Sequence, residues 1–177
     1  MTTHYLFAGF GGQGILFSGK LLAYKGLMEG KHVSWLPSYG PEMRGGTASC
    51  SVIISDEPIG APIVLEPDVL IAMNLPSLDR YEDSVVKGGK IYVDSSLIER
   101  KLERDDVEVC YIPATNIAAK EGIDGLANMI ISGKIIEDNN EWNEEGIEKA
   151  LGKCISARHA DKLEINRKAL NLGKNFN

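Results

Sequence analysis

The sequence GFGGQG at residues 9–14 restricts the fold more than any other stretch of this chain. It follows the apolar run HYLFA and precedes ILFSGKLLA, so a buried strand is expected to lead through a glycine-rich turn into a helix. Gly9, Gly11 and Gly14 have the G-x-G-x-x-G spacing of nucleotide-binding turns, in which glycine lets the backbone approach a phosphate closely. A helix N-terminus behind such a turn attracts anions. The stretch therefore predicts an α/β fold with a candidate anion site at its first turn.

Three interpretations of this glycine turn stay open. A dinucleotide site also requires Asp or Glu about 20 residues further on, at the end of the second strand, but residues 34–38 read SWLPS. The glycines can instead serve only to pack a helix tightly on the sheet, or the turn can bind another phosphate or anion. The overlapping run GILFSGKL resembles G-x-x-x-x-G-K, but Leu21 stands where a phosphate loop has Ser or Thr for magnesium, so we reject that interpretation.

The rest of the chain alternates between apolar strands and helical patterns. The expected strands are 5–9, 32–36, 47–55, 68–73, 90–94 and 106–112. The expected helices are 12–29, a short one from Pro76, 115–121, 126–137, 143–157 and 161–173, with loops at 37–46 and 56–67. No helix separates 32–36 from 47–55, which predicts an antiparallel pairing. We therefore predict one domain over residues 1–177, an α/β layered sandwich with a mostly parallel mixed sheet and C-terminal helices.

Composition excludes several classes of function. The formal net charge of −6 disfavours nucleic acid or an anionic membrane as the main partner. No apolar run approaches the roughly 20 residues that cross a bilayer, and the start MTTH has no signal-peptide features, so a cytoplasmic location is expected. Cys50, Cys110 and Cys154 form no C-x-x-C pair, which disfavours a disulfide framework, a zinc site or an iron–sulfur cluster. No metal ligands and no catalytic residues are identified.

Polar residues follow the predicted strands at the edge where open α/β sheets bind ligands. After the first strand come Gly11, Gly12 and Gln13, and later strands are followed by Asn74, Ser95 and Thr115. Asn, Ser and Thr also cap helices and form turns, so this simpler role stays open for the last three. The loop SYGPEMRGG presents Tyr39, Glu42, Met43 and Arg44, and Arg suits bidentate contact with phosphate or carboxylate. A local Glu42–Arg44 ion pair is the alternative to a ligand or subunit contact.

Five segments taken together indicate a protein family more specifically than any one of them does. GFGGQGILFSGKLLA, WLPSYGPEMRGGTASCSVIIS, DEPIGAPIV, PDVLIAMNLPSLDRY and IPATNIA strongly resemble the gamma subunit of 2-oxoacid:ferredoxin oxidoreductases, nearest to its 2-oxoglutarate and 2-oxoisovalerate types. SYGPEMRGG is the most diagnostic piece, and the resemblance runs through nearly the whole chain. One departure is Ser132-Gly133-Lys134, where similar chains have a Leu-Gly-Ala type of run.

The resemblance implies a Rossmann-like fold and a part in a larger enzyme. Such enzymes convert a 2-oxoacid and coenzyme A into an acyl-CoA and carbon dioxide, and pass two electrons to ferredoxin. Alpha, beta and ferredoxin-like delta subunits hold thiamine diphosphate, magnesium and iron–sulfur clusters, so no tightly bound cofactor is expected here. The isolated chain is expected to be inactive and able to self-associate, for instance as a homodimer.

On this resemblance, two groups of residues are candidates for function. Gly11, Gly12, Gln13, Gly14 and Arg44 are expected to form an anion or coenzyme A site or part of a subunit interface. Tyr39, Glu42, Met43, Asn74, Ser95 and Thr115 are expected at the interface with other subunits. Two alternatives remain, a stand-alone nucleotide-binding oxidoreductase and a ligand-sensing scaffold domain.

Overall fold

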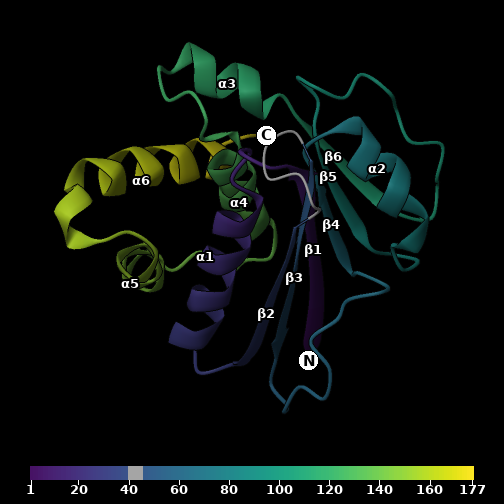
Figure 1. Ribbon diagram of the computed structural model, residues 1–177, viewed down its shortest axis with the longest axis horizontal. Coiled ribbons are helices and arrows are strands. Elements are labelled where there is room, and N and C mark those ends of the chain that lie inside the picture. Colours follow the sequence, from purple (N-terminus) through teal and green to yellow (C-terminus); the bar gives the residue numbers. More distant parts are fainter. Residues whose placement is uncertain (40–45) are drawn as a thin grey trace.

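A mixed β-sheet forms the centre of the molecule in a computed structural model that describes residues 1–39 and 46–177 (Figure 1). Within these ranges six strands have the order β2-β3-β1-β4-β5-β6. They are β1 (Thr2–Phe10), β2 (His32–Tyr39), β3 (Thr47–Ser55), β4 (Val69–Ala72), β5 (Lys90–Asp94) and β6 (Glu108–Ile112). Strands β1, β4, β5 and β6 are parallel, whereas β3 is antiparallel to both β1 and β2. The prediction of a mostly parallel mixed sheet is confirmed.

Helices cover both faces of this sheet. They are α1 (Ile15–Met28), α2 (Leu75–Tyr81), α3 (Ala114–Lys120), α4 (Ala127–Asp138), α5 (Glu144–Cys154) and α6 (Ala160–Lys174), with 3₁₀ turns η1 (Glu82–Ser84) and η2 (Ala157–His159). Figure 1 shows α1, α4, α5 and α6 on one side of the sheet and α2 on the other. No helix in the described ranges is long and apolar enough to cross a membrane.

The alternation of side chains along the strands divides the core in two. Successive residues of a strand point to opposite faces, and in β1 Tyr5 and Phe7 join the larger cluster, which includes residues of α1, α4, α5 and α6. Leu6 joins the smaller cluster with Leu78 of α2. Tyr5, Phe7 and Leu78 are each at most 2% exposed. The apolar runs of the sequence therefore mark strands that are covered on both faces.

Several predicted boundaries differ from those of the structure, and three of the differences have a clear physical reason. Helix α1 begins at Ile15 rather than residue 12, because Gly12 and Gly14 have positive φ angles that do not fit a right-handed helix. Residues 37–39 extend β2 instead of starting a loop, since Tyr39 pairs with Ala48 of β3. The helix expected over 143–157 ends at Cys154.

The connections after β1 and β4 leave the carboxyl edge of the sheet on opposite faces. These strands are parallel neighbours, yet α1 follows β1 on one face and α2 follows β4 on the other (Figure 1). Open α/β sheets bind ligands at such a topological switch point. The fold therefore places the turn at residues 11–14 where a ligand would be expected.

Candidate functional site

The glycine turn, residues 11–14, connects β1 to the first turn of α1. Gly12 and Gly14 have φ angles of 99° and 75°, which residues with a Cβ rarely adopt. Gly14 is the residue immediately before α1, and a Cβ on it would overlap the side-chain amide of Asn128. The turn thus requires glycine at position 14 for its backbone angles and for its contact with α4.

The side chain of Gln13 spans the switch point between β1 and β4. Its Oε1 accepts a hydrogen bond from the N–H of Phe10 at 2.7 Å, and its Nε2 donates to the carbonyl oxygen of Met73 at 2.9 Å. These two bonds connect the residues at the carboxyl ends of neighbouring strands. Gln13 therefore fixes the shape of the turn, and one of its amide hydrogens is already used.

A hollow of about 330 Å³ opens at the N-terminus of α1. It is lined by Phe10, Gly11, Gly12, Gly14, Ile15, Leu16, Phe17 and Ala48. No backbone carbonyl of the described residues accepts from the N–H groups of residues 15–17, and the first turn of α1 contains no acidic side chain. Free N–H groups and the helix dipole make such a terminus favourable for an anion. The geometry can bind a phosphate or a carboxylate.

A second hollow of about 220 Å³ also has Gly12 in its lining. It is lined by Gly12, Gln13, Met73, Leu97, Thr115, Ala118, Asp124, Gly125 and Ala127. Thr115 is fixed there by Asp94, a fully buried carboxylate that accepts from the Thr115 hydroxyl at 2.5 Å and from its N–H at 3.3 Å. Asp94 ends β5 in the run KIYVD, which by its residues resembles an ordinary strand end. Its contacts hold the β5 and β6 ends together.

Two of the polar residues predicted at this edge have local structural roles. Asn74 is buried, and its Oδ1 accepts from the N–H of Ser77 at 2.8 Å, so it caps α2. Ser95 is half-buried, and its N–H donates to the carbonyl oxygen of Ile112 at 2.9 Å. The capping alternative is thus confirmed for Asn74, while a contact of either residue with another subunit stays a prediction.

The diagnostic loop is described only at its two ends. Tyr39 is the last residue of β2, and the N–H of Gly11 donates to the carbonyl oxygen of Gly46 at 2.9 Å. This bond brings the C-terminal end of the loop beside the glycine turn. Glu42, Met43 and Arg44 lie outside the described residues, so their predicted roles stay predictions.

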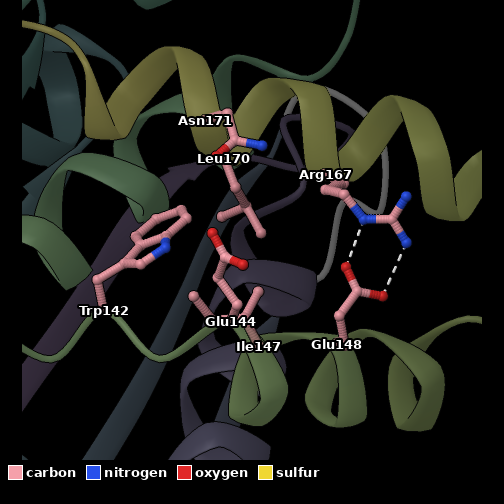
Figure 2. Close-up of a pocket in the computed structure, with 7 residues that line it drawn as sticks. All are labelled: Trp142, Glu144, Ile147, Glu148, Arg167, Leu170 and Asn171. Atoms are coloured by element: carbon pink, nitrogen blue, oxygen red, sulfur yellow. Dashed lines mark hydrogen bonds and ion pairs between the residues drawn. The ribbon is translucent and has the colours of Figure 1, made fainter.

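A separate pocket of about 290 Å³ lies between α5 and α6 (Figure 2). Its lining residues are Trp142, Glu144, Ile147, Glu148, Arg167, Leu170 and Asn171. Figure 2 shows the guanidinium of Arg167 on α6 paired with the carboxylate of Glu148 on α5, and this hydrogen bonding lowers the pKa of Glu148. Both side chains are exposed. The ion pair joins two neighbouring helices. None of the site residues that were predicted from the sequence lines this pocket.

A buried lysine connects the other end of α1 to the segment after α4. Lys25 is 1% exposed, and its Nζ donates to Glu29 at 2.6 Å and to Glu141 at 3.1 Å. A buried ammonium without a partner would strongly destabilise the fold, so these carboxylates compensate it. Burial raises the pKa of the nearby Tyr5 phenol, and the charge of Glu141 adds to the shift. The cluster of Lys25, Glu29 and Glu141 has a structural role, and it was not predicted from the sequence.

The thiols and carboxylates of the described residues are not arranged as an iron–sulfur or zinc site. Among them, no three His, Cys, Asp or Glu residues lie close enough to hold a metal ion. Cys50 is fully buried in the core, and Cys110 and Cys154 are half-buried in different elements. Burial raises the pKa of Cys50 to about 12 and that of Cys154 to about 11, which disfavours the thiolate form that binds metals.

Comparisons with known proteins agree on one family. The family model for pyruvate ferredoxin/flavodoxin oxidoreductase matches residues 4–176. Ketoisovalerate oxidoreductase subunit VorA of Methanothermobacter thermautotrophicus is 48% identical over 126 residues, which cover 71% of this chain and 26% of VorA. 2-Oxoglutarate synthase subunit KorC of Methanocaldococcus jannaschii is 38% identical over 147 residues, which cover 81% of this chain and 79% of KorC.

A solved structure supports the same assignment. The gamma subunit of keto/oxoacid ferredoxin oxidoreductase from Geobacter sulfurreducens superposes with a TM-score of 0.80 at 29% sequence identity. The superposition covers 97% of this chain and 96% of that subunit. Because the family model spans nearly all residues and the fold agrees, the chain belongs to the pyruvate ferredoxin/flavodoxin oxidoreductase family.

Proposed function

We propose that this chain, acting as one domain over residues 1–177, is the gamma-type part of a 2-oxoacid:ferredoxin oxidoreductase. The family match across residues 4–176 is the observation that carries this proposal. In the proposed reaction, a 2-oxoacid and coenzyme A give an acyl-CoA, carbon dioxide and a proton, and two ferredoxins each take one electron. The names of VorA and KorC point to 2-oxoisovalerate or 2-oxoglutarate as the substrate class.

The reactive groups belong, in this proposal, to partner subunits. Alpha and beta subunits would hold thiamine diphosphate and magnesium, and a ferredoxin-like delta subunit would hold iron–sulfur clusters. The lack of a metal-binding cluster among the described residues is compatible with this division. The gamma-type chain would complete the assembly, and the isolated chain would be inactive.

The contribution of this chain to chemistry would be a site for a coenzyme A phosphate. Gly11, Gly12, Gln13 and Gly14 form the turn beside the 330 Å³ hollow, where N–H groups with no partner among the described residues favour an anion. Arg44 would add a positive charge, since its loop returns to the turn through the bond between Gly11 and Gly46. A guanidinium binds phosphate through two parallel hydrogen bonds.

The same edge would contact the other subunits. Tyr39, Glu42 and Met43 belong to or adjoin the diagnostic loop, and Asn74, Ser95 and Thr115 follow β4, β5 and β6 at the carboxyl edge. A coenzyme A site shared between subunits would require the gamma-type chain to present this edge to its partners. Electron transfer to ferredoxin would then take place entirely on those partners.

Co-purification and reconstitution test the proposal. The native protein should purify with thiamine- and cluster-bearing chains, and adding it to those chains should restore 2-oxoacid- and coenzyme A-dependent reduction of ferredoxin. Full activity of the partners without this chain would contradict the proposal, as would oxidation of a 2-oxoacid by this chain alone. Tight binding of NAD or NADP to the isolated chain would favour the stand-alone alternative instead.

Arg44→Ala tests the anion site within the assembled enzyme. We expect a rise of about tenfold or more in the KM for coenzyme A, because a charge-assisted hydrogen bond is lost. Arg158→Ala removes an exposed charge near η2 and is the control, for which no change is expected. An unchanged coenzyme A affinity and turnover in Arg44→Ala would remove Arg44 from the site.

A further inference from the structure

A buried asparagine of α4 is hydrogen-bonded to the glycine turn. Asn128 is 4% exposed, and its Nδ2 donates to the carbonyl oxygen of Gly14 at 3.1 Å and to Oγ of Ser18 at 3.0 Å. Ser18 in turn donates to the carbonyl oxygen of Asn128 at 3.3 Å, and Ser132 donates to the same oxygen at 2.8 Å. The N-terminal turns of α1 and α4 are therefore joined by a closed polar network.

This network adds a second hydrogen bond to a peptide group of the candidate site. The Gly14 carbonyl accepts from both Asn128 and the N–H of Ser18, the latter at 3.0 Å. The carbonyl of Gly14 and the N–H of Ile15 belong to one planar trans peptide and point in opposite directions. The bond from Ser18 directs the oxygen along α1, so the Ile15 N–H is directed toward the N-terminus of α1, where the 330 Å³ hollow opens, and the bond from Asn128 reinforces this orientation.

Space filling between the helices does not by itself explain a polar side chain at this position. The Oδ1 atom of Asn128 is buried and has no hydrogen-bond partner among the described residues. A buried polar atom without a partner lowers stability. An apolar side chain would therefore fill this space at a lower cost in stability than Asn128 does. The Nδ2 atom of Asn128, however, makes a specific hydrogen bond to the carbonyl oxygen of Gly14, the residue before α1.

We propose that Asn128 is a positioning residue of the anion site, which orients the Gly14–Ile15 peptide so that its N–H can reach a coenzyme A phosphate. Ser18 assists by fixing the orientation of the Asn128 amide. This inference rests on the proposed function, because it assumes that the glycine turn binds coenzyme A. Its action is indirect, since Asn128 touches the turn and not the ligand.

Steady-state kinetics of the assembled enzyme tests this role. Asn128→Ala should raise the KM for coenzyme A about tenfold, leave kcat within about twofold and leave the KM for the 2-oxoacid unchanged, because only one or two anion contacts are lost. Ser18→Ala should give a smaller rise of about threefold, since Asn128 can still reach Gly14. Ser18→Ala removes a single hydroxyl group, so this variant can test the inference if the Asn128→Ala enzyme does not assemble.

Asn166→Ala is the matched control. Asn166 on α6 is 6% exposed, its Nδ2 donates to the carbonyl oxygen of Lys162 at 2.7 Å, and its Oδ1 is also buried without a partner. It should lower thermal stability without changing the KM for coenzyme A. An equal effect of Asn128→Ala and Asn166→Ala on that KM would overturn the positioning role, and so would a fall in kcat alone.

Leu16→Glu separates failure of this inference from failure of the coenzyme A site. Leu16 is half-buried and lines the hollow, and a glutamate in the first turn of a helix is compatible with folding. Its charge should repel a phosphate and raise the KM for coenzyme A. A rise in Leu16→Glu without one in Asn128→Ala would refute only the role of Asn128. No rise in either variant would refute the coenzyme A site as well.

Discussion

Gly133 of α4 lies directly against the backbone of Leu170 of α6, and a Cβ on Gly133 would overlap the carbonyl group of Leu170. The contact is reciprocal, because a Cβ on Gly173 of α6 would overlap the carbonyl group of Ile130. Two helices approach this closely only where glycine leaves both backbones uncovered. Gly133 lies in the run Ser132-Gly133-Lys134, and this crossing attaches the C-terminal helix to the core.

Gly133→Ala should therefore destabilise the protein although alanine favours helices. We expect the free energy of unfolding to fall by at least about 2 kcal/mol, because the added methyl group must separate α4 from α6. Urea denaturation followed by circular dichroism measures the change. Gly152→Ala in α5 is the control, since a Cβ there meets no atom within 4 Å and should raise stability by up to about 1 kcal/mol. Equal effects of the two variants would contradict the close crossing.

Gln13→Glu should test the bridge between β1 and β4. A carboxylate can accept from the N–H of Phe10 but cannot donate to the carbonyl oxygen of Met73, so a stability loss of about 1–3 kcal/mol is expected at pH 7. The loss of stability should become smaller as the pH falls and the introduced glutamate is protonated, because a protonated carboxyl group can donate to the carbonyl oxygen of Met73. Urea denaturation at pH 7 and pH 4 measures both values, with the exposed Asn116→Asp as a control. The same loss at both pH values would rule out the Met73 bond.

Asp56 should titrate well below an ordinary aspartate. Its hydrogen bond with Lys31 lowers the pKa of Asp56 from 3.8 to about 2, and the same contact raises the pKa of Lys31. A lowered carboxyl pKa contributes stability that is present above about pH 4 and is lost as the pH falls toward 2. Carbon-detected NMR titration of the Asp56 carboxyl measures this value.

Lys31→Ala should return the Asp56 pKa toward 3.8, while Lys87→Ala should leave it unchanged. Asp56 and Lys31 are both substantially exposed, so the effect on overall stability should be small. The Lys31 contribution runs in the opposite direction, since it is present below pH 10.5 and is lost as the pH rises further. An Asp56 pKa near 3.8 in the unmodified protein would show that the pair does not form in solution.

Cys50 should resist alkylation in the folded protein. It is fully buried, and burial raises its pKa from 9.0 to about 12, so the reactive thiolate is about a thousandfold rarer than in an ordinary thiol. Treatment with iodoacetamide at pH 8, followed by peptide mass spectrometry, should modify the half-buried Cys110 first and Cys50 only after unfolding in urea. Labelling of Cys50 as fast as Cys110 in the native protein would contradict the burial.

Much of the fold was predictable because its signals are local. The apolar runs HYLFA, VLIA and KIYVD lie in strands of the sheet, and the absence of a helix between β2 and β3 correctly predicted their antiparallel pairing. Helical periodicity continues through the glycine turn and so predicts a start of α1 that is too early, because the positive φ angles of Gly12 and Gly14 do not fit a helix. Pro37 predicts a loop at the end of β2, although an edge strand tolerates proline.

The candidate site was predictable only in part. The G-x-G-x-x-G spacing located the glycine turn, and the strand order placed it at a topological switch point. The contact of Asn128 with Gly14 joins residues 114 positions apart, and no pattern in the sequence connects them. Asp94 reads as the end of a strand, and Lys25 reads as an exposed helix residue until Glu29 and Glu141 are placed beside it.

The sequence by itself determined the order of strands and helices, the glycine turn and the family resemblance, because these depend on neighbouring residues and on characteristic segments. Only the tertiary structure decided which distant groups meet: Asn128 with Gly14, Gly133 with Leu170 and Lys25 with Glu141. The physical reason is that hydrogen bonding, close packing and the compensation of buried charge are satisfied across elements. Partners separated by many residues in the chain leave no periodic signal in it.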